Sequence, residues 1–255
     1  MFTSMFDLTG RIALVTGSGQ GIGLTLARGL ASAGARVVLN DIRPDRLETA
    51  VSACRADGID AAGSVFDVTR VDEVQAAVGA IEANVGPIEI LVNNAGLQIR
   101  APLEEFTIES WNTLIAVNVT GVFVASQTVA KRMIPRGHGK IICIGSMQSE
   151  IARPSIAPYT ASKGAVKNLV KGMATDWARY GLQCNGIGPG YFVTEMTKAL
   201  VEDPEFDAWL KSRTPAHRWG AVSELVGAAI FLAADASSFV NGHMLYVDGG
   251  MLACV

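Results

Sequence analysis

Residues 11–23 read RIALVTGSGQGIG, a short apolar run that leads directly into a glycine-rich loop. The apolar residues predict a buried strand, and the residues that follow predict an amphipathic helix over positions 21–33. Gly17, Gly21 and Gly23 have the spacing G-x-x-x-G-x-G, which departs from the general dinucleotide fingerprint G-x-G-x-x-G. Glycines let a backbone approach a pyrophosphate closely, and a helix N-terminus favours its charge. We therefore expect a phosphate-binding loop here; the alternative is a merely flexible connection.

The same alternation of apolar runs and helix-length segments continues along the chain. The expected strands are 11–16, 36–40, 63–68, 88–93, 140–145, 183–188 and 244–247. The expected helices are 21–33, 44–57, 71–85, 108–133, 158–180 and 223–234. Most of the strand-like runs are apolar throughout, which is typical of strands covered on both faces. The order predicts an α/β fold with one doubly wound, seven-stranded parallel sheet and helices on both faces, in a single domain over residues 1–255.

One interval, at about residues 191–220, does not fit this alternation. Loops of this length are usually functional, and ligands of open α/β sheets bind beyond the carboxyl ends of the strands. The interval follows such an end and carries its own helical pattern, TEMTKALVEDPEFDAWLKSR. We expect it to form a substrate-covering segment.

Composition excludes several classes of protein. Of the 255 residues, 49% are hydrophobic and the net charge is −3, so the chain has material for a large core but no basic footprint for nucleic acid. The apolar segments 114–130 and 226–234 are interrupted by polar residues or too short, so we expect buried helices and no membrane span. The N-terminal MFTSMFDLTGR lacks the basic start of a signal peptide, which predicts a cytoplasmic protein. The four cysteines are widely spaced without a CxxC pair, so we assign no disulfide framework and no metal ligand.

Residues 144–165 read IGSMQSEIARPSIAPYTASKGA and contain Ser146, Tyr159 and Lys163. Tyr159 and Lys163 are four apart and would share one face of a helix. The ammonium can stabilise a phenolate and lower a tyrosine pKa that is otherwise about 10. A serine hydroxyl beside them could hold a substrate oxygen, which completes the parts needed to move a proton to or from an alcohol. Tyr-x-x-x-Lys alone is weak, because the pair also occurs on solvated helix faces.

Asp41 follows the second expected strand, eighteen residues after Gly23. A carboxylate at this place can accept hydrogen bonds from the adenosine ribose and repels a 2′-phosphate, which favours NAD. An alternative is that Asp41 caps the helix that begins near Pro44. Arg43 could pair with a 2′-phosphate if Asp41 turned away, so NADP remains open.

Together with Asn93-Asn94-Ala95-Gly96 and Asn118, the glycine loop and the Ser/Tyr/Lys set resemble the short-chain dehydrogenase/reductase family over essentially the whole chain. The resemblance implies a Rossmann fold and an NAD(P)-dependent oxidoreductase. It implies that Tyr159 is the general acid/base, that Lys163 lowers its pKa and holds the nicotinamide ribose, and that Ser146 binds the reacting oxygen. Asn118 would help to hold a water in the proton relay; the alternative is a mere polar interruption of a buried helix.

The resemblance also implies a set of cofactor contacts. They are Gly17, Ser18, Gln20, Gly21, Ile22, Gly23, Asp41, Asp67, Val68, Asn94, Gly96, Tyr159, Lys163, Pro189, Gly190 and Thr194. Asp67 and Val68 would contact adenine, and Pro189, Gly190 and Thr194 would lie along the nicotinamide. The family implies a homotetramer built on the long fourth and fifth helices and the last strand.

The segments SMQSEIARPSIAPYTASKGAVK, PGYFVTEMTKALVEDPEFDAWLKSRTPAHRWG and SSFVNGHMLYVDGGML show a narrower resemblance, to the gluconate 5-dehydrogenase subgroup of the family. That subgroup interconverts D-gluconate and 5-keto-D-gluconate. The subgroup often has two basic residues in a row where this chain has Ile99 and Arg100. We therefore assign the binding of the substrate carboxylate to Arg100 alone.

A sugar acid needs a cation for its carboxylate, and arginine offers a bidentate fork. The candidates are Arg100 and Arg153, with Gln148 and Glu150 for the hydroxyls beside Ser146 and Tyr159. For each, the alternative is a solvated side chain, and Arg153 and Glu150 could simply pair with each other. His217 and Arg218 are weaker candidates.

Two rival functions remain open at this stage. One is a dehydrogenase of the same fold for another polyol, sugar acid or 3-oxoacyl substrate, because fold does not determine substrate. The other is a non-catalytic NAD(P)-sensing protein, which would have no need to keep Asn118, Ser146, Tyr159 and Lys163 together.

Overall fold

The computed structural model describes residues 3–254 and contains a seven-stranded parallel sheet in the order β3-β2-β1-β4-β5-β6-β7. The strands are β1 (Ile12–Val15), β2 (Arg36–Asp41), β3 (Ala61–Val65), β4 (Ile88–Asn93), β5 (Gly139–Ile144), β6 (Leu182–Pro189) and β7 (Met244–Val247). The chain runs outward from β1 to β3 and then returns to β4 beside β1. This reversal opens a crevice at the carboxyl ends of β1 and β4, where such folds bind ligands.

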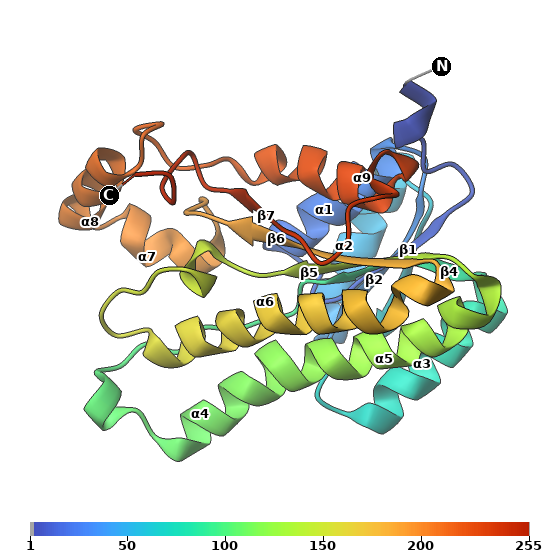
Figure 1. The fold of residues 1–255 in the computed structure, drawn as a ribbon, viewed down its shortest axis with the longest axis horizontal. Helices are drawn as coiled ribbons and strands as arrows, with labels where there is room; N and C mark the ends of the chain where they lie inside the picture. Colours follow the sequence, from blue (N-terminus) through green and yellow to red (C-terminus); the bar gives the residue numbers. More distant parts are fainter. Residues whose placement is uncertain (1–2, 255) are drawn as a thin grey trace.

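Helices cover both faces of the sheet (Figure 1). On one face lie α1 (Gly21–Ser32), α2 (Pro44–Ala56) and α9 (Val226–Ala233). On the other lie α3 (Val71–Asn84), α4 (Ile108–Ile115), α5 (Gly121–Met133) and α6 (Ala157–Trp177). Successive strand residues point to opposite faces, so Ala13 and Val15 enter the first core while Ile12 and Leu14 enter the second. Because both faces are covered, the strand is apolar at every position.

A π-helical turn at Ala116–Thr120 joins α4 to α5, so the two helices form one long segment (Figure 1). Within residues 3–254, the stretch Ile108–Arg136 is the one helix long and apolar enough to cross a membrane by length and composition. Half of its most apolar window is buried in the fold, and Val122, Ala125 and Val129 belong to the second core. These are the properties of a core helix.

The expected order of elements is confirmed, with two corrections. The third strand was expected at residues 63–68 but ends at Val65. β3 is an edge strand whose burial alternates, and the apolar Phe66 and Val68 continue past it into the second core. Burial of these two side chains comes from the turn after the strand and not from the sheet ladder.

The helical pattern over residues 194–213 is also divided. It forms a 3₁₀ turn (Glu195–Thr197), α7 (Lys198–Val201) and α8 (Pro204–Arg213). Pro204 cannot continue the preceding helix because it has no backbone N–H, and Asp203 caps the new one by accepting from the amide of Glu205 at 3.0 Å.

Both helices lie at the same end of the molecule as the loop that follows β5 (Figure 1). A third apolar cluster joins this segment to the rest of the protein through Met147, Leu210 and Met251, with the rings of Tyr191, Phe206 and Trp219 packed against it. The segment therefore lies over the carboxyl end of the sheet, and its role in covering a substrate stays a prediction.

Candidate active site

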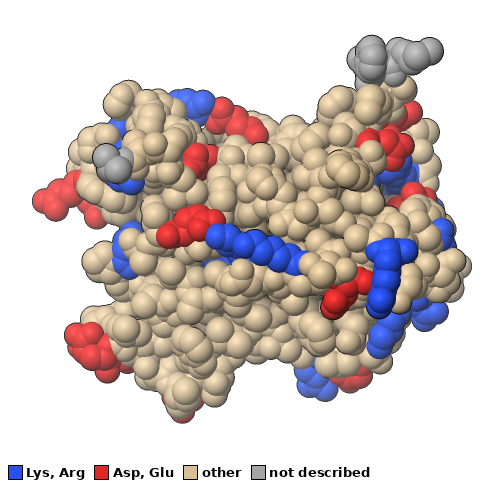
Figure 2. All heavy atoms as spheres, viewed as in Figure 1, with Lys and Arg blue, Asp and Glu red and all other residues tan. Residues whose placement is uncertain are grey.

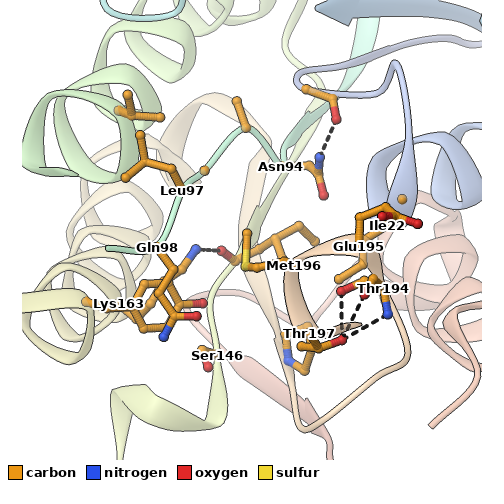
Figure 3. Close-up of a pocket in the computed structure, with 18 of the residues that line it drawn as sticks. Ile22, Asn94, Leu97, Gln98, Ser146, Lys163, Thr194, Glu195, Met196 and Thr197 are labelled. Carbon is orange, nitrogen blue, oxygen red and sulfur yellow. Dashed lines mark hydrogen bonds between the residues drawn. The ribbon is translucent and has the colours of Figure 1, made fainter. Parts of the chain in front are cut away.

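A cavity of about 510 Å³ lies at the carboxyl ends of β1, β2, β4, β5 and β6, beneath the covering segment. Its walls come from the glycine loop, from the turns after the strands and from residues 189–200. In Figure 3, Lys163 and Ser146 lie on one side of it, and Thr194, Glu195 and Ile22 lie on the other. Parts of the chain far apart in sequence therefore share one site.

The glycine loop is shaped for close approach. Gly17 and Gly21 have φ angles of +61° and +58°, which favour glycine. A Cβ on Gly23 would lie 2.6 Å from the carbonyl oxygen of Gly17, so no other residue fits without displacing the loop. The N-cap of α1, Gln20, makes no side-chain capping bond, which leaves the first amides of a long helix directed at the cavity. This cradle fits the pyrophosphate of a dinucleotide.

The expected loop residues have two different roles. Gly17, Gln20, Gly21 and Ile22 line the cavity. Ser18 is fully buried, and its hydroxyl donates to the Val15 carbonyl at 2.7 Å and accepts from the Asn40 amide at 3.0 Å. Ser18, like Gly23, thus shapes the loop from behind and offers its hydroxyl to the protein.

Asp41, Asp67 and Val68 line the cavity at the end that the adenosine would occupy. The Asp67 carboxylate accepts from the amide and hydroxyl of Thr69, both at 2.8 Å, which anchors the turn after β3. Asp41 is only 2% exposed. Its carboxylate receives two bonds from Arg46, at 2.9 and 2.5 Å.

This pairing corrects the expectations for Asp41 and Arg43. Asp41 does not cap α2, whose N-cap is Arg43. The Arg43 guanidinium pairs with Asp45 on the surface, and Arg46 occupies the position beside the carboxylate. Sequence reasoning missed Arg46, the third residue of α2, because only the three-dimensional path of the chain places it beside the strand end.

The remaining predicted cofactor contacts surround the middle of the cavity: Asn94, Gly96, Pro189, Gly190 and Thr194 all line it. Asn94 donates to the carbonyls of Thr16 and Gly17, at 3.0 and 2.9 Å, and so ties the end of β4 to the glycine loop (Figure 3). A Cβ on Gly190 would lie 2.7 Å from the Cα of Asp248, which explains a glycine at this wall.

Asn118 lies in the π-helical turn and is 1% exposed. Its amide nitrogen donates to the Leu97 carbonyl at 2.9 Å and to the Ser162 hydroxyl at 3.1 Å, and its oxygen accepts from the Leu97 amide at 2.9 Å. Both amide hydrogens are therefore used in joining the loop after β4 to α6. A mere polar interruption of the helix does not describe this arrangement, and the part in a water relay stays a prediction.

Ser146, Tyr159 and Lys163 converge on the cavity. The Ser146 hydroxyl accepts from the Gln148 amide at 3.1 Å, and it acts to lower the pKa of Tyr159. Lys163 is buried, donates to the Ile144 carbonyl at 2.8 Å, and has its nitrogen 5.6 Å from the centroid of the Tyr159 ring. The two residues share a face of α6 as their spacing predicted.

Burial shifts the pKa of both residues of this pair. Burial raises the pKa of Tyr159 to about 12, against the opposing effects of the Ser146 hydroxyl and the Arg100 charge. Burial also lowers the pKa of Lys163 to about 8. Loss of solvent is the largest cause of the shift at the phenol, and that Lys163 lowers the Tyr159 pKa stays a prediction.

The substrate end of the cavity contains Arg100, Arg153, Gln148 and Tyr191. Burial and the neighbouring charge of Arg153 lower the pKa of Arg100, so the two guanidinium groups repel each other across the cavity. Arg153 also lies 5.4 Å from the centroid of the Phe206 ring. Within residues 3–254, Gln148 Oε1, Arg153 Nε and the Tyr191 hydroxyl are buried without a hydrogen-bond partner. Such groups call for a polar ligand, and Tyr191 is a lining residue that sequence reasoning missed.

Three other candidates lie elsewhere. Glu150 bonds to the Tyr246 hydroxyl and pairs with Lys167 at 2.5 Å, so it neither contacts Arg153 nor points into the cavity. The His217 ring lies against the Lys211 carbonyl at 2.8 Å, and Arg218 pairs with Glu224. The predicted substrate contact of Glu150 and the weaker candidacies of His217 and Arg218 are therefore wrong, since each side chain already has a partner on the surface.

Comparison with known proteins agrees with this arrangement. Residues 11–205 match the family described as short chain dehydrogenase. The chain is 62% identical over 247 residues to gluconate 5-dehydrogenase of Gluconobacter oxydans (strain 621H), covering 97% of this chain and 96% of that protein. It is 56% identical over 251 residues to 5-keto-D-gluconate 5-reductase of Escherichia coli (strain K12), covering 98% and 99%.

A solved structure shows the same likeness in three dimensions. The gluconate 5-dehydrogenase from Burkholderia cenocepacia J2315, in complex with NADP and tartrate, has a TM-score of 0.98 and 58% identity over 100% of both chains. The family match and the sequence identities show that this chain is an oxidoreductase that belongs to the short-chain dehydrogenase family.

Proposed function

We propose that this oxidoreductase interconverts D-gluconate and 5-keto-D-gluconate, with NAD or NADP as the hydride carrier. The observation that carries the proposal is a pair of guanidinium groups, Arg100 and Arg153, in the same cavity as the Tyr159 hydroxyl. Two cations in one cavity with a proton donor suit an acid with a reacting alcohol some carbons away. The names of the relatives at 62% and 56% identity support the same substrate.

The residues of the chain divide the work between them. Arg100 and Arg153 bind the carboxylate, and Gln148 and Tyr191 supply the unpartnered polar atoms that bind hydroxyl groups. Ser146 donates to or accepts from the reacting oxygen while its own position is held by the Gln148 amide. The C5 oxygen of the substrate is thereby placed within reach of Tyr159.

Tyr159 moves the proton. In reduction its protonated hydroxyl donates to the carbonyl oxygen, and in oxidation its phenolate takes the proton of the alcohol. The nicotinamide, when bound, supplies or accepts the hydride at the substrate carbon. The glycine loop, Asn94 and Thr194 would hold that cofactor along the cavity wall, with Lys163 beside its ribose.

We also propose the homotetramer and the cytoplasmic location that the family resemblance implies. The exposed Trp111 and Phe123 on α4 and α5 support association, because large apolar side chains at a surface favour contact with another chain. Figure 2 shows that the face presented by these helices has few charged side chains. Light scattering of the purified protein tests the assembly: a mass near 107 kDa, four times the 26.8 kDa of the chain, is expected, and a monomer would rule it out.

Initial rates with D-gluconate and with 5-keto-D-gluconate, each with both cofactors, test the main proposal. D-glucitol, which has the same hydroxyl pattern without the carboxylate, is the matched control. We expect efficient turnover of the acid and poor turnover of the polyol. Turnover of the polyol as fast as the acid would favour a polyol dehydrogenase, and cofactor binding with no turnover of any alcohol or carbonyl would favour a sensing protein.

A further inference from the structure

The Glu150 carboxylate joins three elements beside the cavity. Its Oε1 accepts from the hydroxyl of Tyr246 on β7 and pairs with the Lys167 ammonium on α6 at 2.5 Å. The side chains of Glu150 and Lys167 are only 34% and 24% exposed. Lys167 and Tyr246 both lower the pKa of Glu150, so the carboxylate is charged at neutral pH. The bridge is thus a partly buried contact between separate parts of the fold.

Glu150 ends the turn that carries two residues of the site. Ser146 caps the 3₁₀ turn Met147–Ser149, and its hydroxyl accepts from the Gln148 amide at 3.1 Å. The Glu150 amide closes the turn by donating to the Met147 carbonyl at 3.0 Å. A turn of this length has few backbone bonds of its own, so its position depends on the contacts that anchor it.

The helix side of the bridge continues the face that carries the proton donor. Tyr159, Lys163 and Lys167 are spaced four apart along α6, so they lie on successive turns of one side of the helix. The turn also packs against this helix. The bond between Glu150 and Lys167 therefore fixes the turn relative to α6, and with it the separation of Ser146 from Tyr159.

The strand side of the bridge reaches another wall of the cavity. Tyr246 is in register with Gly188 on β6, and a Cβ on Gly188 would collide with the Tyr246 ring. A glycine at this position lets the ring lie across β6 and reach Glu150. The next residues, Pro189 and Gly190, line the cavity. One carboxylate thus links the turn after β5 both to α6 and to the strands β6 and β7.

We propose that Glu150 is a positioning residue for the dehydrogenase reaction. Held by Lys167 and Tyr246, it keeps the turn at the distance from α6 at which Ser146 and Tyr159 meet the same substrate oxygen. Glu150 lies outside the lining of the cavity and acts through the turn. A displacement of about 1 Å at a reacting group can cost about a hundredfold in rate, so a residue outside the cavity can control turnover. This inference rests on the proposed function, which gives Ser146 and Tyr159 their roles.

Initial rates with D-gluconate test the positioning role. Glu150→Ala removes the bridge and should lower kcat roughly ten- to hundredfold. Glu150→Gln keeps an acceptor oxygen and should lower kcat by less than about tenfold, and it also serves if the alanine variant folds poorly. KM and the dissociation constants of the cofactors should change by less than about fivefold, because Arg100 and the glycine loop are unaltered.

Glu82→Gln is the matched control. Glu82 pairs with Arg136 at the amino end of β4, the two side chains are 17% and 24% exposed, and neither residue lines the cavity. This variant should lower the melting temperature and keep the kcat of the unaltered protein. A loss of kcat in Glu82→Gln equal to that in Glu150→Ala would show that any weakened ion pair has this effect, and it would overturn the proposal.

Reversal of the ion pair supplies a second check. Glu150→Lys alone places two ammonium groups together and should lose turnover. Glu150→Lys combined with Lys167→Glu restores opposite charges at the same two places and should recover most of the lost kcat. Absence of any recovery would contradict the proposal.

Hydrogen exchange of the amides in residues 146–151, measured without substrate, tests the anchoring apart from turnover. Exchange should be faster in Glu150→Ala than in the unaltered protein, and it should be unchanged in Glu82→Gln. Faster exchange in a protein that does not oxidise D-gluconate would remove the proposed substrate and leave the anchoring by Glu150 standing. Turnover of D-gluconate with unchanged kcat and unchanged exchange in Glu150→Ala would do the opposite.

Discussion

The Lys163 ammonium nitrogen lies 5.6 Å from the centroid of the Tyr159 ring, one helical turn further along α6. At that distance the lysine stands beside the phenol without bonding to its oxygen, and its hydrogen bond goes to the Ile144 carbonyl at the end of β5. The lysine therefore fixes the first turns of α6 against the end of β5, two residues before Ser146. This relationship sets out how proton transfer should depend on each residue.

Tyr159→Phe removes the proton donor and leaves the ring that packs in the cavity. Turnover should fall by about 10²–10⁴-fold, which is the usual contribution of a positioned acid or base. The dissociation constant for the cofactor, measured by fluorescence, should stay within about threefold, since the ring is kept. Tyr180→Phe, at an exposed tyrosine beyond the end of α6, is the control and should keep full activity. Residual activity above a tenth of normal would refute the assignment.

Lys163 should make stability depend on pH. Its pKa is about 8 in the folded protein and 10.5 in its ordinary state, because burial disfavours the charge. Between these values the unfolded chain binds more protons, so the free energy of unfolding should rise as pH increases from 8 towards 10.5. Denaturant melts of the unaltered protein and of Lys163→Met at several pH values give the two free energies of unfolding. The free energy of the unaltered protein minus that of Lys163→Met isolates the contribution of Lys163.

The subtraction removes the contribution of Lys140, whose pKa burial also lowers to about 8. The difference should grow in favour of the unaltered protein as pH rises through this window. A difference that is flat or that shrinks with pH would show that Lys163 stays charged when buried.

Arg100→Gln should weaken binding of an acid more than that of a polyol. Loss of a charge-assisted bond to a carboxylate predicts a rise in KM for D-gluconate of roughly ten- to hundredfold. The rate with D-glucitol should change little, because that molecule offers no anion. Arg132→Gln, at an exposed arginine near the end of α5, provides the control. Equal effects on both substrates would mean that Arg100 acts through the shape of the loop.

Gly23→Ala should damage the cofactor site. The added Cβ would stand 2.6 Å from the Gly17 carbonyl oxygen and would collide with the Asn94 amide, so the glycine loop must shift. Affinity for both cofactors should drop at least tenfold with a lower melting temperature. Gly79→Ala on α3 meets nothing within 4 Å, and it should stabilise the protein by up to about 1 kcal/mol through helix propensity. Thermal melts and cofactor titrations of the two variants measure this contrast.

The succession of strands and helices along the chain, the glycine loop and the helix that carries Tyr159 and Lys163 were all open to sequence reasoning. The signals are local: a buried strand is apolar at each position, positive φ angles favour glycine, and residues four apart share a helix face. The third strand was misplaced for the same reason, because Phe66 and Val68 are apolar but are buried by a turn.

Only the tertiary structure decided which polar side chains already have a hydrogen-bond or ion-pair partner within the protein. Asp41 pairs with Arg46 instead of standing alone, and Glu150 is held by Tyr246, which lies ninety-six residues away. Burial, which depends on the whole fold, raises the pKa of Tyr159 although a lysine stands beside it. Local pattern thus determined the framework and the identity of the chemical groups. Long-range packing determined their charge and their partners, because solvation and hydrogen bonding depend on neighbours that sequence spacing does not specify.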